Sequence, residues 1–518
     1  MQRKSYFPFF ILLATVVSIT FGAYATVSMP GIFGDHMVLQ QKKFLPVWGK
    51  ADAGEQVTIT LGRNSEDCAA DTSGAWMVRL PKMRAGGPYE LKIEGKDNTL
   101  VFSDVLIGEV WLGSGQSNMN WPVNRSLNAD EEIAGATYPR VRLFTVKRGV
   151  AASPQDNCEG AWVVCSPETV PEFSAALYFF GRELHQQLDG VPMGLIHTSW
   201  GGTPAESWTS RAMLESDSDL ACILQRWDEK LAAYPAAKEA HDKAMEAWQQ
   251  AVEQAKASGA AEPPKPEAPQ GPDSPWVPAS LYNAMIAPLV PYAIQGAIWY
   301  QGESNAGRAY QYRKLFPAMI TDWRNAWGQG PFSFYFVQLA NFMDVAPDPG
   351  ESEWAELREA QTMTLSLKNT GMAVIIDIGE AKDIHPKNKQ DVGRRLALNA
   401  LAKNYHKDVE WSGPQYKSMR VWNDNITLKF NHVNSGLTTR NGEALQGFAI
   451  AGADKKFVWA DAVIKGKSVV VSSPQVAEPV AVRYGWANNP VCTLVNGKGL
   501  PASPFRTDQW PGLTVNNK

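Results

Sequence analysis

The sequence of 518 residues predicts an α/β fold: a five-stranded parallel sheet covered by helices in a three-layer sandwich, with all-β regions before and after it. Between residues 104 and 404, short apolar runs alternate with segments whose apolar residues recur at helical spacing. Outside this range the alternation has the period of two that is typical of strands. Helical crossovers between strands indicate a parallel sheet. The expected strands lie near residues 105–112, 193–198, 294–301, 332–339 and 371–378.

Residues 1–25 have the pattern of a signal peptide. Arg3 and Lys4 precede a mostly apolar stretch at 7–19, and the small residues at 23–25 fit a cleavage site. The apolar stretch is short for a membrane span, so an uncleaved anchor is the weaker alternative. We therefore expect a secreted or periplasmic protein that has no membrane segment after cleavage.

Residues 26–103 are expected to form an N-terminal β-sandwich-like domain, because residues 57–61 alternate and glycine-rich turns follow. Residues 405–518 are expected to form a C-terminal β-rich domain, with similar alternation at 426–430. This second β domain follows the main polar clusters of the chain. It can wall a crevice or bind sugar but cannot supply those clusters.

The central segment, 104–404, is expected to contain helices near 177–188, 315–323 and 388–404. An insertion at 216–278 interrupts it. Two apolar faces separated by Pro235 predict a helical hairpin, followed by a proline-rich linker. The insertion is either a solvated structural excursion or a lid near the crevice.

Composition restricts the possible partners. A net charge of -4 gives no reason to expect nucleic acid or an acidic membrane surface. Nineteen tryptophans indicate large cores, with sugar-stacking platforms as the alternative for a few. Of the five cysteines, Cys158 and Cys165 could form a small-loop disulfide, or all five could be thiols. No spacing indicates a metal site, and no cofactor is implied.

Four polar clusters follow apolar runs in the central segment. They are GQSNM at 115–119, TSWGGTP at 198–204, WYQGESN at 299–305 and DIHP at 383–386. The carboxyl ends of parallel strands share one edge of a sheet, so the clusters can meet in one crevice. Together they offer a nucleophile, donors for an oxyanion and an acid–base pair.

These four blocks resemble those of the SGNH (GDSL-type) hydrolases, and their wording is similar to the sialate O-acetylesterase branch of that superfamily. The resemblance extends from about Pro30 to Asp508. The general pattern has two residues between the acid and the histidine, whereas Asp383 and His385 have one between them, as in the sialate-esterase branch. The resemblance therefore implies an SGNH-type fold and a serine esterase.

Ser117 is the candidate nucleophile and His385 the candidate base, because His385 lies in a loop two residues from a carboxylate. Asp383 is the candidate acid, and its charge should raise the pKa of the imidazole. Asp377 and Glu380 are alternative acids. The weaker alternatives are His197 as base and Ser199 as nucleophile.

The tetrahedral intermediate of ester hydrolysis needs hydrogen-bond donors. The backbone N–H groups of Ser117 and of Gly202 or Gly201 are candidates. The resemblance places an amide side chain in the third block, where Gln301 and Asn305 are both available. Gln116 and Glu303 are assigned to substrate binding, although Glu303 could instead hold its loop.

The expected activity is removal of O-acetyl groups from carbohydrate through an acetyl-serine intermediate. The resemblance makes O-acetylated sialic acid the leading substrate. Acetylated xylan or another polysaccharide is the alternative within the enzyme class. A carbohydrate-binding protein on an inactive hydrolase scaffold is the alternative from another class, and the complete Ser/Asp/His set argues against it.

Overall fold

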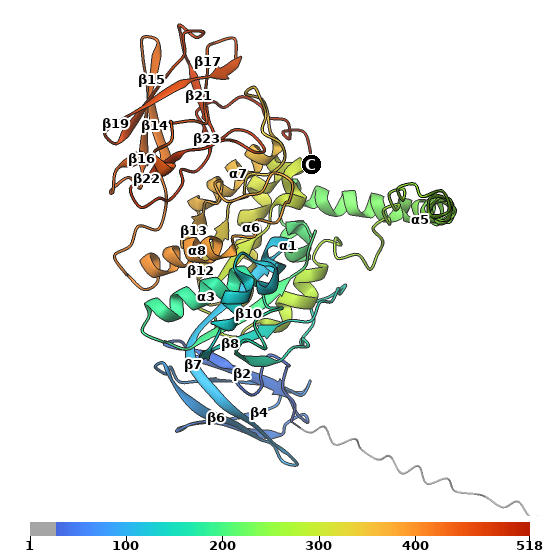
Figure 1. Cartoon of the computed structure of the whole chain (residues 1–518). Coiled ribbons are helices and arrows are strands. Elements are labelled where there is room, and N and C mark those ends of the chain that lie inside the picture. Colours follow the sequence, from blue (N-terminus) through green and yellow to red (C-terminus); the bar gives the residue numbers. More distant parts are fainter. Residues whose placement is uncertain (1–26) are drawn as a thin grey trace, which may run out of the picture.

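The computed structural model describes residues 27–518 (Figure 1). The expected signal peptide at 1–25 lies outside the described residues. The chain forms a mixed α/β centre, with one β-rich region from the start of the described chain and another from its end on opposite sides (Figure 1). This arrangement confirms the mixed α/β class.

A large sheet forms the centre, in the order β13-β12-β11-β7-β10-β8-β9. Every neighbouring pair from β13 to β8 is parallel, and β9 is antiparallel to β8. All five expected strands are present. The sequence analysis missed β8, because its charged and proline residues hide the apolar pattern. The strands are β7 (Thr99–Gly115), β8 (Tyr138–Thr145), β9 (Trp162–Cys165), β10 (Met193–Ser199), β11 (Gly296–Tyr300), β12 (Ser333–Val337) and β13 (Thr370–Ala373).

Strand β7 belongs to two layers. Its first half pairs with β6 in the N-terminal region and alternates between exposed and half-buried residues. Its second half is buried throughout and pairs with β10 and β11. The strand therefore crosses residues 103 and 104 without a break, where the sequence pattern changes. The other N-terminal strands are β1 (Val38–Gln40), β2 (Leu45–Lys50), β3 (Gln56–Leu61), β4 (Asn64–Ala69), β5 (Ala75–Leu80) and β6 (Gly86–Glu94).

Helices cover both faces of the central sheet. On one face α3 (Ala175–Gln187) and α8 (Lys389–Lys403) pack on each other and on the strands. On the other face lies α6 (Ala309–Trp327), with α7 (Glu353–Met363) beside it. These positions confirm the three helices expected from the apolar spacing. The short helical segments are α1 (Ser117–Asn120), η1 (Val123–Arg125), α2 (Ala129–Ala134), η2 (Ala205–Trp208), α4 (Arg211–Glu215), η3 (Tyr282–Ile286), η4 (Ala287–Leu289), η5 (Glu303–Arg308) and η6 (Thr364–Ser366).

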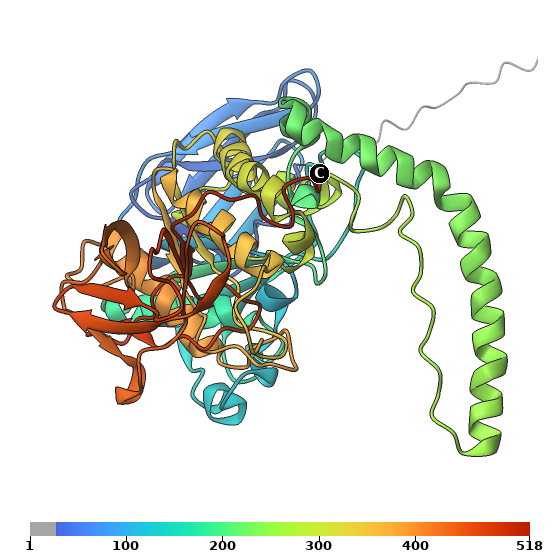
Figure 2. The same ribbon diagram turned by 90° about the horizontal axis from the view of Figure 1, so that it is seen from above.

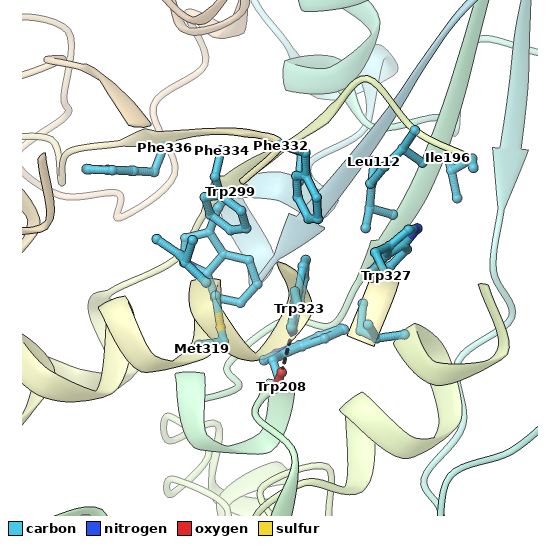
Figure 3. Close-up of a cluster of buried hydrophobic side chains, with 14 of the residues drawn as sticks. Leu112, Ile196, Trp208, Trp299, Met319, Trp323, Trp327, Phe332, Phe334 and Phe336 are labelled. Atoms are coloured by element: carbon cyan, nitrogen blue, oxygen red, sulfur yellow. Dashed lines mark hydrogen bonds between the residues drawn. The ribbon is translucent and has the colours of Figure 1, made fainter. Parts of the chain in front are cut away.

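Tryptophans dominate the core under α6 (Figure 3). The rings of Trp299 and Trp323 meet edge to face, with centroids 5.8 Å apart. The Trp323 ring N–H donates to the backbone carbonyl of Trp208 at 2.8 Å. Trp208 ends the segment after the second polar block, and Trp299 begins the third. The core thus holds two of the blocks in place, and these tryptophans are core residues rather than sugar platforms.

The insertion differs from the expected hairpin. Residues Ser218–Ser258 form one helix, α5, with Pro235 inside it. Its first three turns bury Leu220, Ile223 and Trp227, and the rest extends away from the body (Figures 1 and 2). Pro235 does not separate two helices as the sequence predicts, because a mostly solvent-exposed helix can bend around a proline. The proline-rich segment returns alongside, where the Trp248 ring N–H donates to the Pro263 carbonyl.

The cysteines form no disulfide in the described chain, and all five, including Cys158 and Cys165, are thiols. None of the helices within residues 27–518 combines the length and the apolar character that crossing a membrane requires.

The C-terminal region contains small antiparallel sheets, in the orders β14-β15-β20-β19, β18-β17-β21-β23 and β16-β22. The buried Arg358 of α7 joins this region to the centre by donating to the carbonyls of Leu339, Ala340, Ala487 and Asn488. Burial lowers the pKa of Arg358 to about 9. The elements are β14 (Gln415–Trp422), β15 (Asn425–Asn431), β16 (Leu437–Thr439), η7 (Arg440–Gly442), β17 (Phe448–Ala451), β18 (Phe457–Trp459), β19 (Asp461–Lys465), β20 (Ser468–Ser472), β21 (Ala481–Tyr484), β22 (Leu494–Asn496) and β23 (Phe505–Arg506).

The substitution Arg358→Met should lower the melting temperature by several degrees. It keeps an unbranched apolar stem but leaves buried carbonyl groups without donors, at about 1–3 kcal/mol for each one that stays unsatisfied. Differential scanning calorimetry measures the change. Arg420→Met is the matched control, because Arg420 is exposed on β14. Equal melting temperatures for the two variants would show that Arg358 does not join the two regions.

Candidate active site

Ser117 lies directly after β7, at the carboxyl edge of the central sheet. The turn requires glycine at 115, where φ is +142° and a Cβ atom would lie 2.2 Å from the carbonyl oxygen of Tyr300. A side chain at 115 would therefore push β7 and β11 apart. The Gln116 N–H donates to the same carbonyl, so the turn is held against the third polar block.

His385 and Asp383 lie in the loop after β13, and this loop brings them to Ser117. The His385 Nε2 is 2.9 Å from the Ser117 Oγ, and its Nδ1 is 3.1 Å from the Asp383 Oδ1. The His385 backbone N–H also donates to Asp383 Oδ1, at 2.9 Å. A carboxylate only accepts, so the neutral ring carries its proton on Nδ1 and presents the Nε2 lone pair to the serine hydroxyl. The structure thus brings the three candidate catalytic residues together.

The environment of His385 lowers its pKa below 6.5, contrary to the expected rise. Partial burial is the largest cause; Asp383 opposes it, and the positive charge of Lys389 adds to it. The indole of Trp121 stacks on the imidazole, with centroids 4.9 Å apart and planes 18° apart, and so covers one face of the ring. The expected rise of the His385 pKa rested on the charge of Asp383 alone, and it left out the covering indole of Trp121 and the charge of Lys389.

The alternative acids have other partners. Asp377 lies beyond the end of β13 and pairs with Arg395, with an N–O distance of 2.6 Å. Glu380 accepts from the Lys387 backbone N–H. Asp383 is the carboxylate that contacts the ring. Burial opposes a fall in its pKa, but hydrogen bonds from His385 and nearby positive charges outweigh burial and lower the pKa.

The alternative nucleophile and base form a separate pair inside the protein. His197 Nε2 is 2.6 Å from Ser199 Oγ, and both side chains are buried in β10. Burial, with a smaller effect of the Arg148 charge, lowers the pKa of His197 to about 3. A substrate that reaches Ser117 does not reach this pair.

The second block lies against the nucleophile. A Cβ atom at Gly201 would be 3.3 Å from the Ser117 Cβ, so the glycine permits close approach. The N–H groups of Gly201 and Gly202 make no hydrogen bond within residues 27–518. Ser117 starts α1, and the N–H groups of a first helical turn also lack intrahelical partners.

Gln301 and Asn305 do not fit the expected role as oxyanion donors. Both are buried, and the two amide hydrogens of Gln301 go to the Thr203 carbonyl and the Asn305 Oδ1. Asn305 donates to Glu206 Oε2 and accepts from the Ala205 N–H. These amides hydrogen-bond to the backbone of Thr203 and Ala205 and so hold the end of the second block in place.

Gln116 and Glu303 are predicted to bind substrate, but in the structure their side chains form hydrogen bonds that hold the loops together. The buried Gln116 accepts, through Oε1, from the Gly302 and Ser304 N–H groups at 3.4 Å. Glu303 accepts from the Asn118 amide at 2.6 Å, and its other carboxylate oxygen is buried and has no hydrogen-bond partner among residues 27–518. Burial raises the pKa of Glu303, although the Asn118 bond opposes the rise.

The sequence analysis missed Asn118 and Lys389, which complete this network. The Asn118 amide donates to Glu303 and to the Ile384 carbonyl, and its oxygen accepts from the Lys389 ammonium at 2.6 Å. Lys389 is fully buried, and burial lowers its pKa to about 7. Lys389 is the first residue of α8, where a positive charge is unfavourable because it opposes the helix dipole. This unusual placement is the feature of the sequence that could have indicated a special role for Lys389.

Comparison with known proteins identifies the family of the chain. Residues 270–402 match the family model of a carbohydrate esterase, sialic acid-specific acetylesterase. The chain is 30% identical to the sialate O-acetylesterase of Rattus norvegicus over 96% of its length and 97% of the relative's. The sialate O-acetylesterase of Homo sapiens is also 30% identical, over 93% of each chain.

The chain belongs to the sialate O-acetylesterase family. It is therefore a carboxylic ester hydrolase. A solved carbohydrate acetylesterase from Xanthomonas citri is 38% identical, with a TM-score of 0.80 over 94% of this chain and 100% of that one. Ser117 lies outside the residues that the family model matches, whereas Asp383 and His385 lie within them.

Replacing Lys389 by methionine in this esterase should reduce kcat about 10²-fold. The substitution removes the hydrogen bond that holds Asn118, and Asn118 in turn holds the loop of His385 through the Ile384 carbonyl, so His385 should lose its alignment with Ser117. The substitution also removes a charge that lowers the His385 pKa, so the acid limb of the pH–rate profile should move to higher pH. Steady-state kinetics between pH 4 and 8 measures both effects. Lys382→Met, exposed in the same loop, is the control. A fall in kcat without a shift of the acid limb would contradict the expected effect of the Lys389 charge on the pKa of His385.

Proposed function

We propose that this esterase removes O-acetyl groups from sialic acid through an acetyl-serine intermediate. The observation that carries the proposal is the hydrogen-bonded chain from Ser117 through His385 to Asp383, in a family member related to sialate O-acetylesterases over nearly its whole length. The substrate is an O-acetylated carbohydrate, and none of the proposed steps uses a cofactor.

In the proposed acylation step, His385 Nε2 takes the proton of Ser117 as Oγ attacks the acetyl carbonyl. Asp383 holds the ring in the required tautomer and stabilises its cation. The oxyanion receives hydrogen bonds from the backbone N–H groups of Ser117 and Gly202. His385 then protonates the leaving sugar oxygen. Water, activated by the same ring, releases acetate and restores Ser117.

The proposal extends to the fold type, the domains and the location. The parallel strand ends that carry the four blocks support an SGNH-type hydrolase domain at 104–404, between β domains at 26–103 and 405–518. The leader pattern at 1–25 supports secretion or periplasmic export, with cleavage before Thr26.

Acetate release from O-acetylated sialic acids and from acetylated xylan tests the function. We expect kcat/KM to be higher for the sialic acids. Ser117→Ala should lose about 10³-fold or more while keeping its fold, because triad members act as a unit. A phosphonate that reacts with serine nucleophiles should label Ser117. Ser199→Ala is the control and should keep labelling. Release from xylan alone would instead make the chain a polysaccharide esterase, a class that the 38% identical carbohydrate acetylesterase keeps open.

The three candidate acids should separate by mutation. Asp383→Asn should lower kcat by orders of magnitude, because the ring loses the partner of Nδ1, whereas Asp377→Asn and Glu380→Gln should retain more activity. In the wild type, the rate should fall on the acid side around a pKa below 6.5, because the base must be neutral and its environment lowers its pKa. Initial rates across pH for the four proteins measure this. An inactive Glu380→Gln beside an active Asp383→Asn would reassign the acid.

A further inference from the structure

Arg148 carries a positive charge at the edge of the sheet where the blocks meet. It follows β8, which is parallel to β10, so it lies near the carboxyl ends of both strands. Its Nη2 donates to the Asn120 side-chain oxygen at 2.6 Å, and its Nε donates to the Ser199 carbonyl at 3.3 Å. The guanidinium lies over the Trp200 ring, 5.7 Å from its centroid. These contacts fix the position of the charge.

Both hydrogen-bond partners of Arg148 lie next to the nucleophile. Asn120 is the last residue of the single helical turn that begins at Ser117. Ser199 ends β10, two residues before Gly201, which lies against the Ser117 side chain. Arg148 is therefore held beside the position where the acetyl ester must bind.

The charge of Arg148 has no carboxylate partner within 4.0 Å in the described part of the chain. Its two acceptors are neutral oxygens, and partial burial lowers its pKa. Two of the five guanidinium N–H groups are used, and the residue is exposed to solvent. By contrast, the buried Arg142 on β8 pairs with Asp104 at 2.6 Å. An unpaired arginine beside a nucleophile is suited to an anionic group of the substrate.

We propose that Arg148 binds the carboxylate of the substrate, so that the esterase selects acetylated sugars that carry an acid group. The inference rests on the proposed function, because a sialic acid has a carboxylate and neutral xylan has none. The free N–H groups of the planar guanidinium match the two oxygens of a carboxylate. Trp200 supports the guanidinium from one side and leaves its N–H edge for the ligand.

The test compares an O-acetylated sialic acid with its C1 carboxamide, which keeps the sugar and the ester but lacks the charge. A chromogenic acetyl ester reports the chemical step alone. We expect Arg148→Gln to lower kcat/KM for the acid roughly 10- to 100-fold, mainly through KM, because a hydrogen bond between charged groups is lost. The same variant should change kcat/KM for the carboxamide and for the chromogenic ester less than about threefold. Arg148→Lys should recover part of the lost activity on the acid.

Two control variants make the result specific. Arg420→Gln removes an exposed arginine in the C-terminal region, and Lys387→Gln removes an exposed cation near Asp383. Neither should change the ratio of acid to carboxamide rates. A changed ratio in Lys387→Gln, with none in Arg148→Gln, would move the carboxylate site and overturn the proposal.

Equal losses on the acid and the carboxamide in Arg148→Gln would also overturn it, because Arg148 would then act without recognising the charge. If the wild type cleaves both sialic acid derivatives equally well, the selection for acidic sugars is wrong while the proposed function stands. If the wild type cleaves the chromogenic ester and acetylated xylan but neither sialic acid derivative, the proposed function fails together with this inference.

Discussion

The buried amide of Asn118 is the contact on which the site depends. It joins three segments that are far apart in sequence: the turn after Ser117, the third block at Glu303 and the loop of His385. A buried ammonium or carboxylate alone would be costly, and each shifts its pKa toward the neutral form. Asn118 gives both Lys389 and Glu303 a hydrogen bond and uses its remaining donor on the carbonyl between Asp383 and His385. The alignment of the acid–base pair therefore depends on groups that do not touch the reacting atoms.

The meeting of Ser117, Asp383 and His385 could be predicted from the sequence because each lies in a polar block after an apolar run, and the ends of parallel strands share one edge of a sheet. The roles of Gln116, Gln301 and Glu303 could not. A polar side chain after a strand can face the crevice or turn inward to bind the backbone of a neighbouring loop, and both choices have the same local sequence. Burial decides between them, and burial depends on which loops meet. Buried donors and acceptors must find partners, so most of the polar side chains in the blocks stabilise loops.

The fold was predictable where one periodicity dominates. The five apolar runs lie in the central sheet, whereas β8 was missed because Pro139, Arg140 and Arg142 interrupt its pattern. The boundary expected at residue 103 falls inside β7, where the environment changes from one exposed face to complete burial while the strand continues. In the insertion, Pro235 was interpreted as a helix end. The helix instead continues through Pro235, because few packed neighbours around this part of α5 oppose a bend. The pattern of apolar and polar residues thus predicts whether an element is buried or exposed better than it predicts where the element begins and ends.

Two basic side chains, Lys389 and Arg148, lie near the catalytic residues. Within residues 27–518 neither side chain has a carboxylate oxygen within 4.0 Å, and the positive charge of Lys389 lowers the pKa of His385. A lower pKa makes His385 a weaker base, but it keeps the ring neutral in more acidic medium. Asp383 limits the loss in basicity by stabilising the imidazolium when it forms, so the carboxylate and Lys389 act on the same ring in opposite directions.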